Sequence, residues 1–174
     1  MKRGIVLLLS AALAGGAAGC GYHTLGAATH LPAGVHTLSV PVFATRTESY
    51  RTEAVLTQAV IREFAQRTRL RVSADEGGDP DAVVRGVILK ETSAPLTYNV
   101  STQQSSSYLL TLVVSVTVTG RDGKVLYENP NYVYRQQFQS TSNLPVFFQE
   151  SPAAIERLSR EFARQLVADV LEGF

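Results

Sequence analysis

The stretch YLLTLVVSVTVT, residues 108–119, decides the fold of this chain of 174 residues. From residue 110 onward, large apolar side chains occupy every second position, and mostly threonine and serine stand between them. A period of two predicts a β-strand with one face in the core and a hydroxyl-rich opposite face. Fully extended, the stretch spans about 40 Å, well above the usual strand length. The apolar set is Leu110, Leu112, Val114, Val116 and Val118.

The segments on either side predict the partners of this strand. An Asp-Gly pair within residues 120–124 is a hairpin signal. The return strand then runs from residue 124 towards residue 138, and Pro130 within it implies a bulge or an edge position. Upstream, residues 82–92 (AVVRGVILKET) are apolar on both faces, which is typical of an interior strand. The polar connection of residues 93–107 is either a mobile loop or a hairpin tip extending beyond the domain.

The N-terminal part of the domain is predicted to hold a strand and a helix. Residues 37–43 (TLSVPVF) alternate, which places Leu38, Val40 and Val42 on one face. Two threonines after them are turn and helix-cap candidates. Apolar residues four apart predict a helix over residues 50–68. The RLRVS segment that follows is either a short strand or the helix exit.

A second amphipathic helix is predicted at the C-terminal end, where Ser151 fits the N-cap and Pro152 the first helical position. The element order is therefore β-α-β-β-β-α, and the first β-α-β predicts a parallel crossover. We expect an α+β fold: a two-layer sandwich with both helices packed on one face of a mostly antiparallel four-stranded sheet.

The first residues predict an export signal. Residues 1–19 combine a short basic start, an apolar run and a series of small residues, which describes a signal peptide. The apolar run is too short for a permanent membrane helix, which needs about 20 residues. Cys20, the single cysteine, follows it directly.

Cys20 is interpreted as a lipidation site. The sequence Ala-Ala-Gly-Cys resembles the lipobox of bacterial lipoproteins, in which the thiol accepts a diacylglyceryl group. The alternatives are a buried structural cysteine or a free thiol, since no second cysteine exists for a disulfide within the chain. Several acyl chains, palmitate among them, anchor a protein stably because each buried methylene contributes about 0.8 kcal/mol.

The mature chain divides into a tether and one domain. Residues 20–36 form the lipidated N-terminus and a tether rich in Gly, Ala and Thr, and residues 37–174 form a single α+β domain. His23, His30 and His36 show no metal-ligand spacing, so we interpret them as surface residues and expect no metal.

Charge and motifs exclude several function classes. The chain has 16 basic and 15 acidic residues, and loss of Lys2 and Arg3 with the leader leaves no basic excess, which argues against a nucleic-acid binder. The acidic loop ADEGGDPDA lacks calcium-loop spacing. No phosphate loop or nucleophile motif appears, and all histidines lie in or beside the tether. We therefore expect no catalytic residue, no cofactor and no enzyme. Tyrosines of the return strand are interpreted as packing rather than as a binding face.

Several separated motifs together resemble one family. They are Cys-Gly-Tyr at residues 20–22, Val-Pro-Val-Phe at residues 40–43, Leu-Thr-Gln-Ala at residues 56–59 and the strand opening at residues 81–86. In order and spacing they resemble the lipopolysaccharide-assembly lipoprotein family LptE. Departures are Pro80, where the family often has Ala, and the segment after Phe43, where Asn and Pro-Gly are common.

The resemblance implies a non-enzymatic role in the cell outer membrane. Such a lipoprotein pairs with the β-barrel LptD as plug and assembly factor, and assists insertion of lipopolysaccharide. It is lipid-anchored on the periplasmic side. Under this reading, Arg85, Lys90, Lys124 and Arg135 are the candidates for contact with lipid A phosphates.

The alternative is a periplasmic lipoprotein that regulates a cell-wall synthase or forms part of a secretion pore. A regulator needs a long tether. The tether here, about fifteen residues at about 3.5 Å each, is short for reaching through the cell wall.

Overall fold

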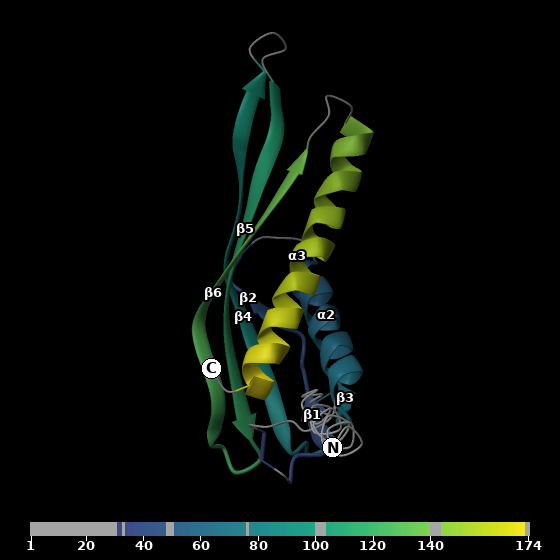
Figure 1. Ribbon diagram of the computed structural model, residues 1–174, viewed down its shortest axis with the longest axis vertical. Helices are drawn as coiled ribbons and strands as arrows, with labels where there is room; N and C mark the ends of the chain where they lie inside the picture. The colour runs from purple at the N-terminus through teal and green to yellow at the C-terminus, as the bar shows by residue number, and fades with distance from the viewer. Residues whose placement is uncertain are drawn as a thin grey trace, which may run out of the picture.

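The computed structural model describes residues 31–32, 34–47, 51–75, 77–99, 104–139 and 144–172; Cys20, His23 and His30 lie outside these ranges. Figure 1 shows an elongated two-layer molecule, with a sheet on one side and two helices on the other. The elements are β1 (Thr37–Ser39), β2 (Ala44–Thr45), α2 (Thr52–Arg67), β3 (Arg71–Ser73), β4 (Ala82–Asn99), β5 (Gln104–Gly120), β6 (Val125–Gln139) and α3 (Leu144–Glu172).

The sheet has six strands, so the prediction of a four-stranded sheet was wrong. Its order is β3-β1-β4-β5-β6, and β2 pairs with β4 beside β1. The three long strands pair antiparallel, whereas the short strands β1, β2 and β3 pair parallel with their neighbours. β1 lies within the strand predicted over residues 37–43, and β3 lies within RLRVS, for which a short strand was one of two alternatives. The separate strand β2 was not predicted, because two residues are too few to show a period. The α+β class and the interior position of β4 are confirmed.

The predicted first strand is split in two. Both β1 and β2 pair with β4, and Pro41, which has no backbone N–H to donate, stands between them. The break also changes the face that each side chain presents. Leu38 and Val40 are buried as expected, but Val42 is 61% exposed and Phe43 fills the core in its place.

The connection of residues 93–107 is a hairpin extension and not a mobile loop over its described part. β4 continues to Asn99 and β5 begins at Gln104, and the two strands remain paired throughout. Figure 1 shows this ribbon projecting beyond the other strands. Residues 92–120 contain no Lys, Arg, Asp or Glu, so the projecting end carries no charge.

Of the register shifts between the long strands, two decide which functional side chains share a face. One extra residue lies in β4 between Ile88 and Lys90, and another lies in β6 opposite the step from Val116 to Val114. The second surrounds Pro130, which confirms the bulge predicted there. Each bulge reverses the alternation of the strand that carries it, because the extra residue occupies one place in the period of two.

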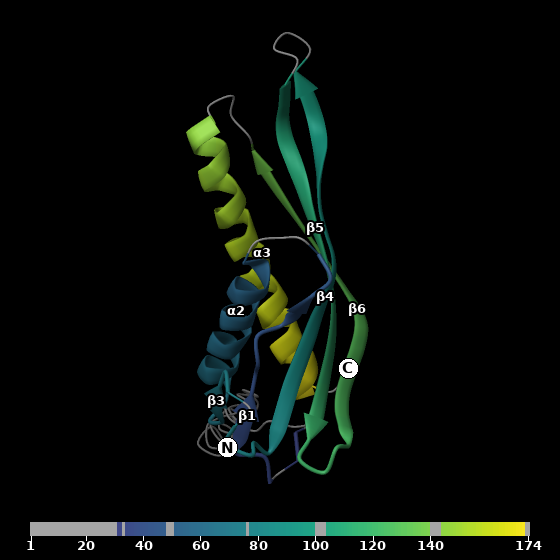
Figure 2. The ribbon, with the colours of Figure 1, turned by 180° about the vertical axis from the view of Figure 1, so that it is seen from behind.

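Both helices cover the same face of the sheet, as Figures 1 and 2 show from the two sides. α2 buries the predicted stripe of Leu56, Val60 and Phe64, each 0% exposed. Its N-cap is Arg51, which makes no side-chain cap hydrogen bond, so the threonine caps were wrong; Thr45 and Thr47 instead bond to each other in a turn.

α3 begins at Leu144, eight residues before the predicted start, and Pro152 lies inside it. Proline fits a first turn, but it removes a single backbone donor, so a helix of 29 residues can continue through it. Among the described residues, no helix is long and apolar enough to cross a membrane. The buried residues of α3 are Ala154, Leu158, Ser159, Phe162, Ala163, Leu166, Val167 and Val170.

Candidate functional site

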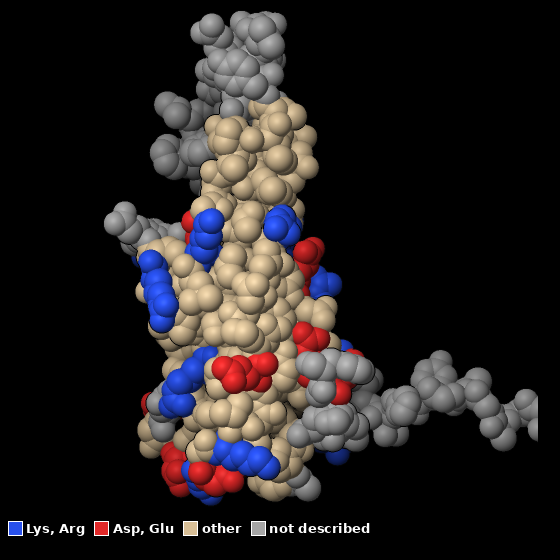
Figure 3. All heavy atoms as spheres, turned by 90° about the vertical axis from the view of Figure 1, so that its left-hand side faces the viewer, with Lys and Arg blue, Asp and Glu red and all other residues tan. Residues whose placement is uncertain are grey.

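The face of the sheet away from the helices is the candidate functional surface, and we call it the outer face. On β5 the even-numbered residues from Leu110 to Val118 are buried under the helices. The odd-numbered residues are half-buried and point outward, and most carry hydroxyl groups. Figure 3 looks at this side and shows Lys and Arg side chains, with Asp and Glu side chains among them, spaced over a largely uncharged surface. Glu128 is one acidic residue of the outer face, since it pairs with Thr117 as Arg85 does. The hydroxyl-rich strand face predicted from the sequence is therefore part of the surface.

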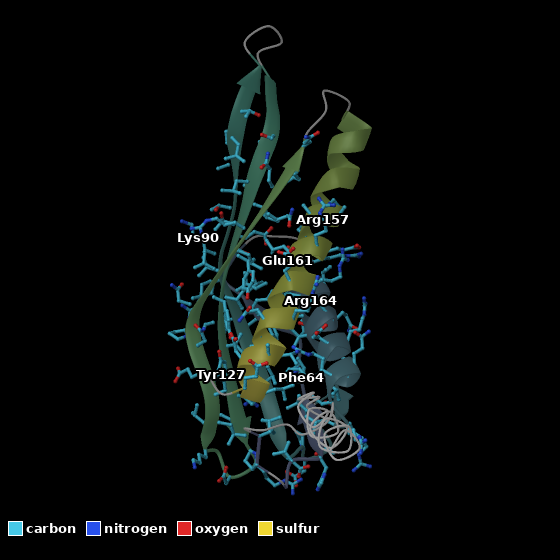
Figure 4. All side chains as sticks on the ribbon, viewed as in Figure 1. Phe64, Lys90, Tyr127, Arg157, Glu161 and Arg164 are labelled. Atoms are coloured by element: carbon cyan, nitrogen blue, oxygen red, sulfur yellow. The ribbon has the colours of Figure 1, made fainter. Side chains whose placement is uncertain are left out.

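Three of the four predicted basic residues lie on the outer face. Arg85 is paired with Thr117, Lys90 with Val113, and Arg135 with Thr111 on the next strand. Facing residues of paired strands point to the same side, so all three side chains share the outward side of Thr117, Val113 and Thr111. Figure 4 shows Lys90 projecting away from the helices.

The bulge in β4 places Arg85 and Lys90 on the same face of the sheet. They are five residues apart, and in a regular strand an odd separation would place them on opposite faces. The extra residue between Ile88 and Lys90 returns Lys90 to the outer face. Arg85 also donates to Thr119 Oγ1 at 3.4 Å, which orients its guanidinium across the hydroxyl-rich strand.

Lys124 lies apart from the other three. It is in the turn between β5 and β6, where it lines an open cavity of about 550 Å³ with Asp81, Arg121 and Asp122. The structure therefore does not bring all four predicted residues together.

Asp81 organises this end of the domain, a role that sequence reasoning missed. Its Oδ2 accepts hydrogen bonds from the backbone N–H groups of His36 and Thr37, both at 2.9 Å, and from Thr37 Oγ1 at 2.7 Å. Its Oδ1 lies 3.0 Å from Arg121 Nη2. One carboxylate thus ties the entry into β1 to the start of β4 and the β5–β6 turn. The available signal was its position directly before the β4 strand.

These contacts predict a pH-dependent stability. Hydrogen bonds from His36 N–H and then from Thr37 lower the pKa of Asp81 from 3.8 to about 2. A depressed pKa stabilises the folded state fully above 3.8, and the contribution disappears as pH falls from 3.8 towards 2. Asp81→Asn should therefore lower the urea midpoint of unfolding at pH 7. The difference in midpoint between the variant and the wild type should become smaller at pH 2.5.

The control for this prediction is Asp122→Asn, which removes a neighbouring exposed carboxylate. Its urea midpoint should differ little from that of the wild type at both pH values. If the difference in midpoint for Asp81→Asn stayed constant between pH 7 and pH 2.5, the role assigned to the Asp81 carboxylate would be contradicted.

The tyrosines of β6 pack in the core, as predicted. Tyr132 is 6% exposed, and its ring meets Phe162 edge-on at 5.6 Å between centroids. Its hydroxyl contacts the hydroxyl of Tyr127 and donates to Asp169 Oδ2 at 2.7 Å, and burial raises the pKa of Tyr132 above its ordinary value. The β6 bulge brings Tyr127 and Tyr132, five residues apart, to the same face. This network fastens α3 to the sheet.

The described residues include no cluster of three or more His, Cys, Asp or Glu that could hold a metal ion. His36 is exposed, and Asp79 and Asp81 both contact Arg121. The chemistry that the outer face offers is hydrogen bonding through hydroxyl groups and ionic contact with anions.

Comparison with known proteins identifies a family from the sequence and a shared fold from solved structures. The family model LptE, described as lipopolysaccharide-assembly, matches residues 35–170. No curated protein matches the sequence. Among solved structures, uncharacterized lipoprotein B of Nitrosomonas europaea is similar with a TM-score of 0.57 and 10% identity, over 85% of this chain and 88% of that one.

Two further structures share the fold. A lipoprotein of Caulobacter crescentus has a TM-score of 0.53 and 11% identity, over 76% of this chain and 89% of that one. The PelC dodecamer of Paraburkholderia phytofirmans has a TM-score of 0.51 and 10% identity, over 79% and 87%. At such low identity these structures establish the fold alone.

Proposed function

The chain belongs to the LptE family of lipopolysaccharide-assembly proteins, and we propose that it is the lipoprotein partner of the outer-membrane β-barrel LptD. The observation that carries this proposal is the extent of the family match, which runs from before β1 to the last turn of α3. In this role the domain plugs the barrel, assists its assembly and helps to insert lipopolysaccharide. The role is not enzymatic.

The outer face supports this role. The interior of an outer-membrane barrel is polar, and a hydroxyl-rich sheet face can form hydrogen bonds with it. Arg85, Lys90 and Arg135 are suited to the phosphates of lipid A, because charge-assisted bonds to phosphate are strong. Lys124, at the far end of β5, is the least suited of the four.

Membrane attachment is assigned to the N-terminal segment. We propose that residues 1–19 are removed, that Cys20 carries the acyl chains, and that residues 20–36 lead to the domain from the periplasmic side of the outer membrane. Cys20→Ser should leave the precursor unlipidated, and the chain should disappear from the outer-membrane fraction on a density gradient. Normal fractionation of the variant would contradict the assignment of Cys20.

The decisive experiment is affinity purification of the tagged chain from detergent-solubilised membranes. A large β-barrel should be recovered with it, together with lipopolysaccharide. Recovery of a cell-wall synthase instead of a barrel would contradict the proposal.

The same preparation tests the basic residues. Lys90→Gln combined with Arg135→Gln should lower the recovered lipopolysaccharide severalfold, because two contacts with phosphate are lost. Arg69→Gln, an exposed arginine beyond the end of α2, is the matched control and should recover the wild-type amount. Equal losses in the double variant and the control would show that the outer face is not the contact.

A second candidate is a ring of copies of this chain that forms part of a secretion pore. The observation that favours it is the fold shared with the PelC dodecamer. Purification distinguishes the two, since a ring predicts a large assembly that contains only this chain.

A further inference from the structure

A groove between the two helices is a site of a different kind. It has a volume of about 430 Å³ and runs between the first three turns of α2 and the middle of α3. Figures 1 and 2 show the two helices side by side along this length. Three arginines line it, Arg51, Arg62 and Arg160, together with Ser159 and Glu156.

The charge of the groove favours an anion. Arg160 approaches Glu156 at 3.9 Å, but both side chains are more than half exposed, so this pair is weak. Of the charged residues that line the groove, three are arginines and one, Glu156, is acidic. Guanidinium groups present several parallel N–H donors, which fit the oxygen atoms of phosphate.

A buried hydroxyl without a partner lines the same groove. Among the described residues, four buried side-chain oxygens have no hydrogen-bond partner, in Thr52, Glu53, Glu91 and Ser159. Of these four, Ser159 is the one that lines the groove, and it is 1% exposed. Such atoms are rare in native proteins and call for a partner, such as a bound ion.

We propose that this groove binds a phosphate group, held by Arg62 and Arg160, with the Ser159 hydroxyl as a neutral donor. The site is separate from the outer face, since the helices and the sheet form opposite layers of the molecule (Figure 1). It does not depend on the function proposed above, and loss of either one leaves the other testable.

The test measures the melting temperature of the full chain in neutral detergent, because a ligand that binds only the folded state raises it. Sodium pyrophosphate is compared with sodium chloride at matched ionic strength. Short-chain phosphatidylglycerol below its micelle concentration is compared with phosphatidylcholine of the same chain length. A rise with pyrophosphate identifies a free phosphate compound as the ligand, and a rise with phosphatidylglycerol alone identifies a lipid headgroup. No rise with either overturns the proposal.

Variants locate the effect. Arg62→Gln and Arg160→Gln should each lower the affinity for the anion about tenfold, which is the usual loss for one hydrogen bond to a charged group. Arg69→Gln, outside the groove, removes the same charge and should change nothing. An equal loss of affinity in Arg69→Gln would show that the anion responds to overall charge, and it would overturn the proposed site.

Ser159→Ala separates binding from structure. Removing a buried hydroxyl without a partner should leave the melting temperature of the unliganded chain unchanged or higher. The same variant should shrink the rise caused by the anion. A lower melting temperature without anion, with the full rise retained, would assign Ser159 to helix packing and overturn its role as a donor.

Discussion

Phe162→Ala is expected to lower the free energy of unfolding by about 3–5 kcal/mol, the usual cost of deleting a buried phenylalanine. Phe162 is 0% exposed and lies where α3 meets the sheet. Its ring contacts Phe43 at 6.3 Å, Tyr132 at 5.6 Å and Tyr134 at 5.4 Å between centroids, each in an edge-to-face arrangement. Removal would leave a cavity between three aromatic rings from two strand regions. Urea unfolding followed by circular dichroism measures the loss.

Two further variants bracket this prediction. Val133→Ala removes an apolar side chain that is 39% exposed on the outer face, and it should change the free energy by no more than about 0.5 kcal/mol. Phe162→Leu keeps much of the volume and should cost clearly less than Phe162→Ala. If the losses for Phe162→Ala and Val133→Ala were equal, Phe162 would not join the two layers.

Gly86→Ala should be nearly as damaging, by overpacking. A Cβ added at Gly86 would lie 2.3 Å from ring atoms of Phe43, far inside van der Waals contact. Phe43 is 2% exposed and also touches Phe162, so its ring has little room to move. Overpacking of this kind costs typically 1–3 kcal/mol and occasionally more, and we expect a loss of about 3 kcal/mol in the same urea assay.

A double-mutant cycle shows whether the clash is the cause. Phe43→Ala removes the ring, so Gly86→Ala on that background should cost much less than on the wild type. Gly34→Ala is the matched control, because a Cβ there meets no atom within 4 Å. Additive losses in the cycle would refute the steric explanation.

Long elements were predictable because their patterns repeat. The stretch of residues 108–119 shows the period of two over its whole length, and the structure places it at the centre of β5. The stripe of α2, at residues 56, 60 and 64, repeats with the helical period and was also predicted. The break between β1 and β2 was not predicted and β3 was left as one of two alternatives, since segments of two or three residues have no period to detect.

The predicted start of α3 was wrong for a different reason. The pair Ser151 and Pro152 has the chemistry of a helix start, yet the helix passes through it. A short motif shows only that its residues are compatible with the start of a helix. Packing against neighbouring segments decides where the helix begins.

The candidate surface was only half predictable. The sequence identified the hydroxyl-rich side of β5 and the basic residues, but not which of those residues share a face. Arg85 and Lys90 meet because one bulge shifts the alternation of β4, and Tyr127 and Tyr132 meet because another shifts that of β6. Pro130 predicted the bulge in β6, whereas no residue around Leu89 predicts the bulge in β4.

The sequence by itself determined the α+β class, the hairpin of β5 and β6, both amphipathic helices and the family motifs, because each rests on a repeating pattern or a fixed local spacing. Only the tertiary structure decided the parallel short strands, the set of basic residues on the outer face, the role of Asp81 and the groove between the helices. These depend on register and on contacts between residues far apart in the chain. Such contacts are chosen by the packing of the whole domain rather than by any one segment.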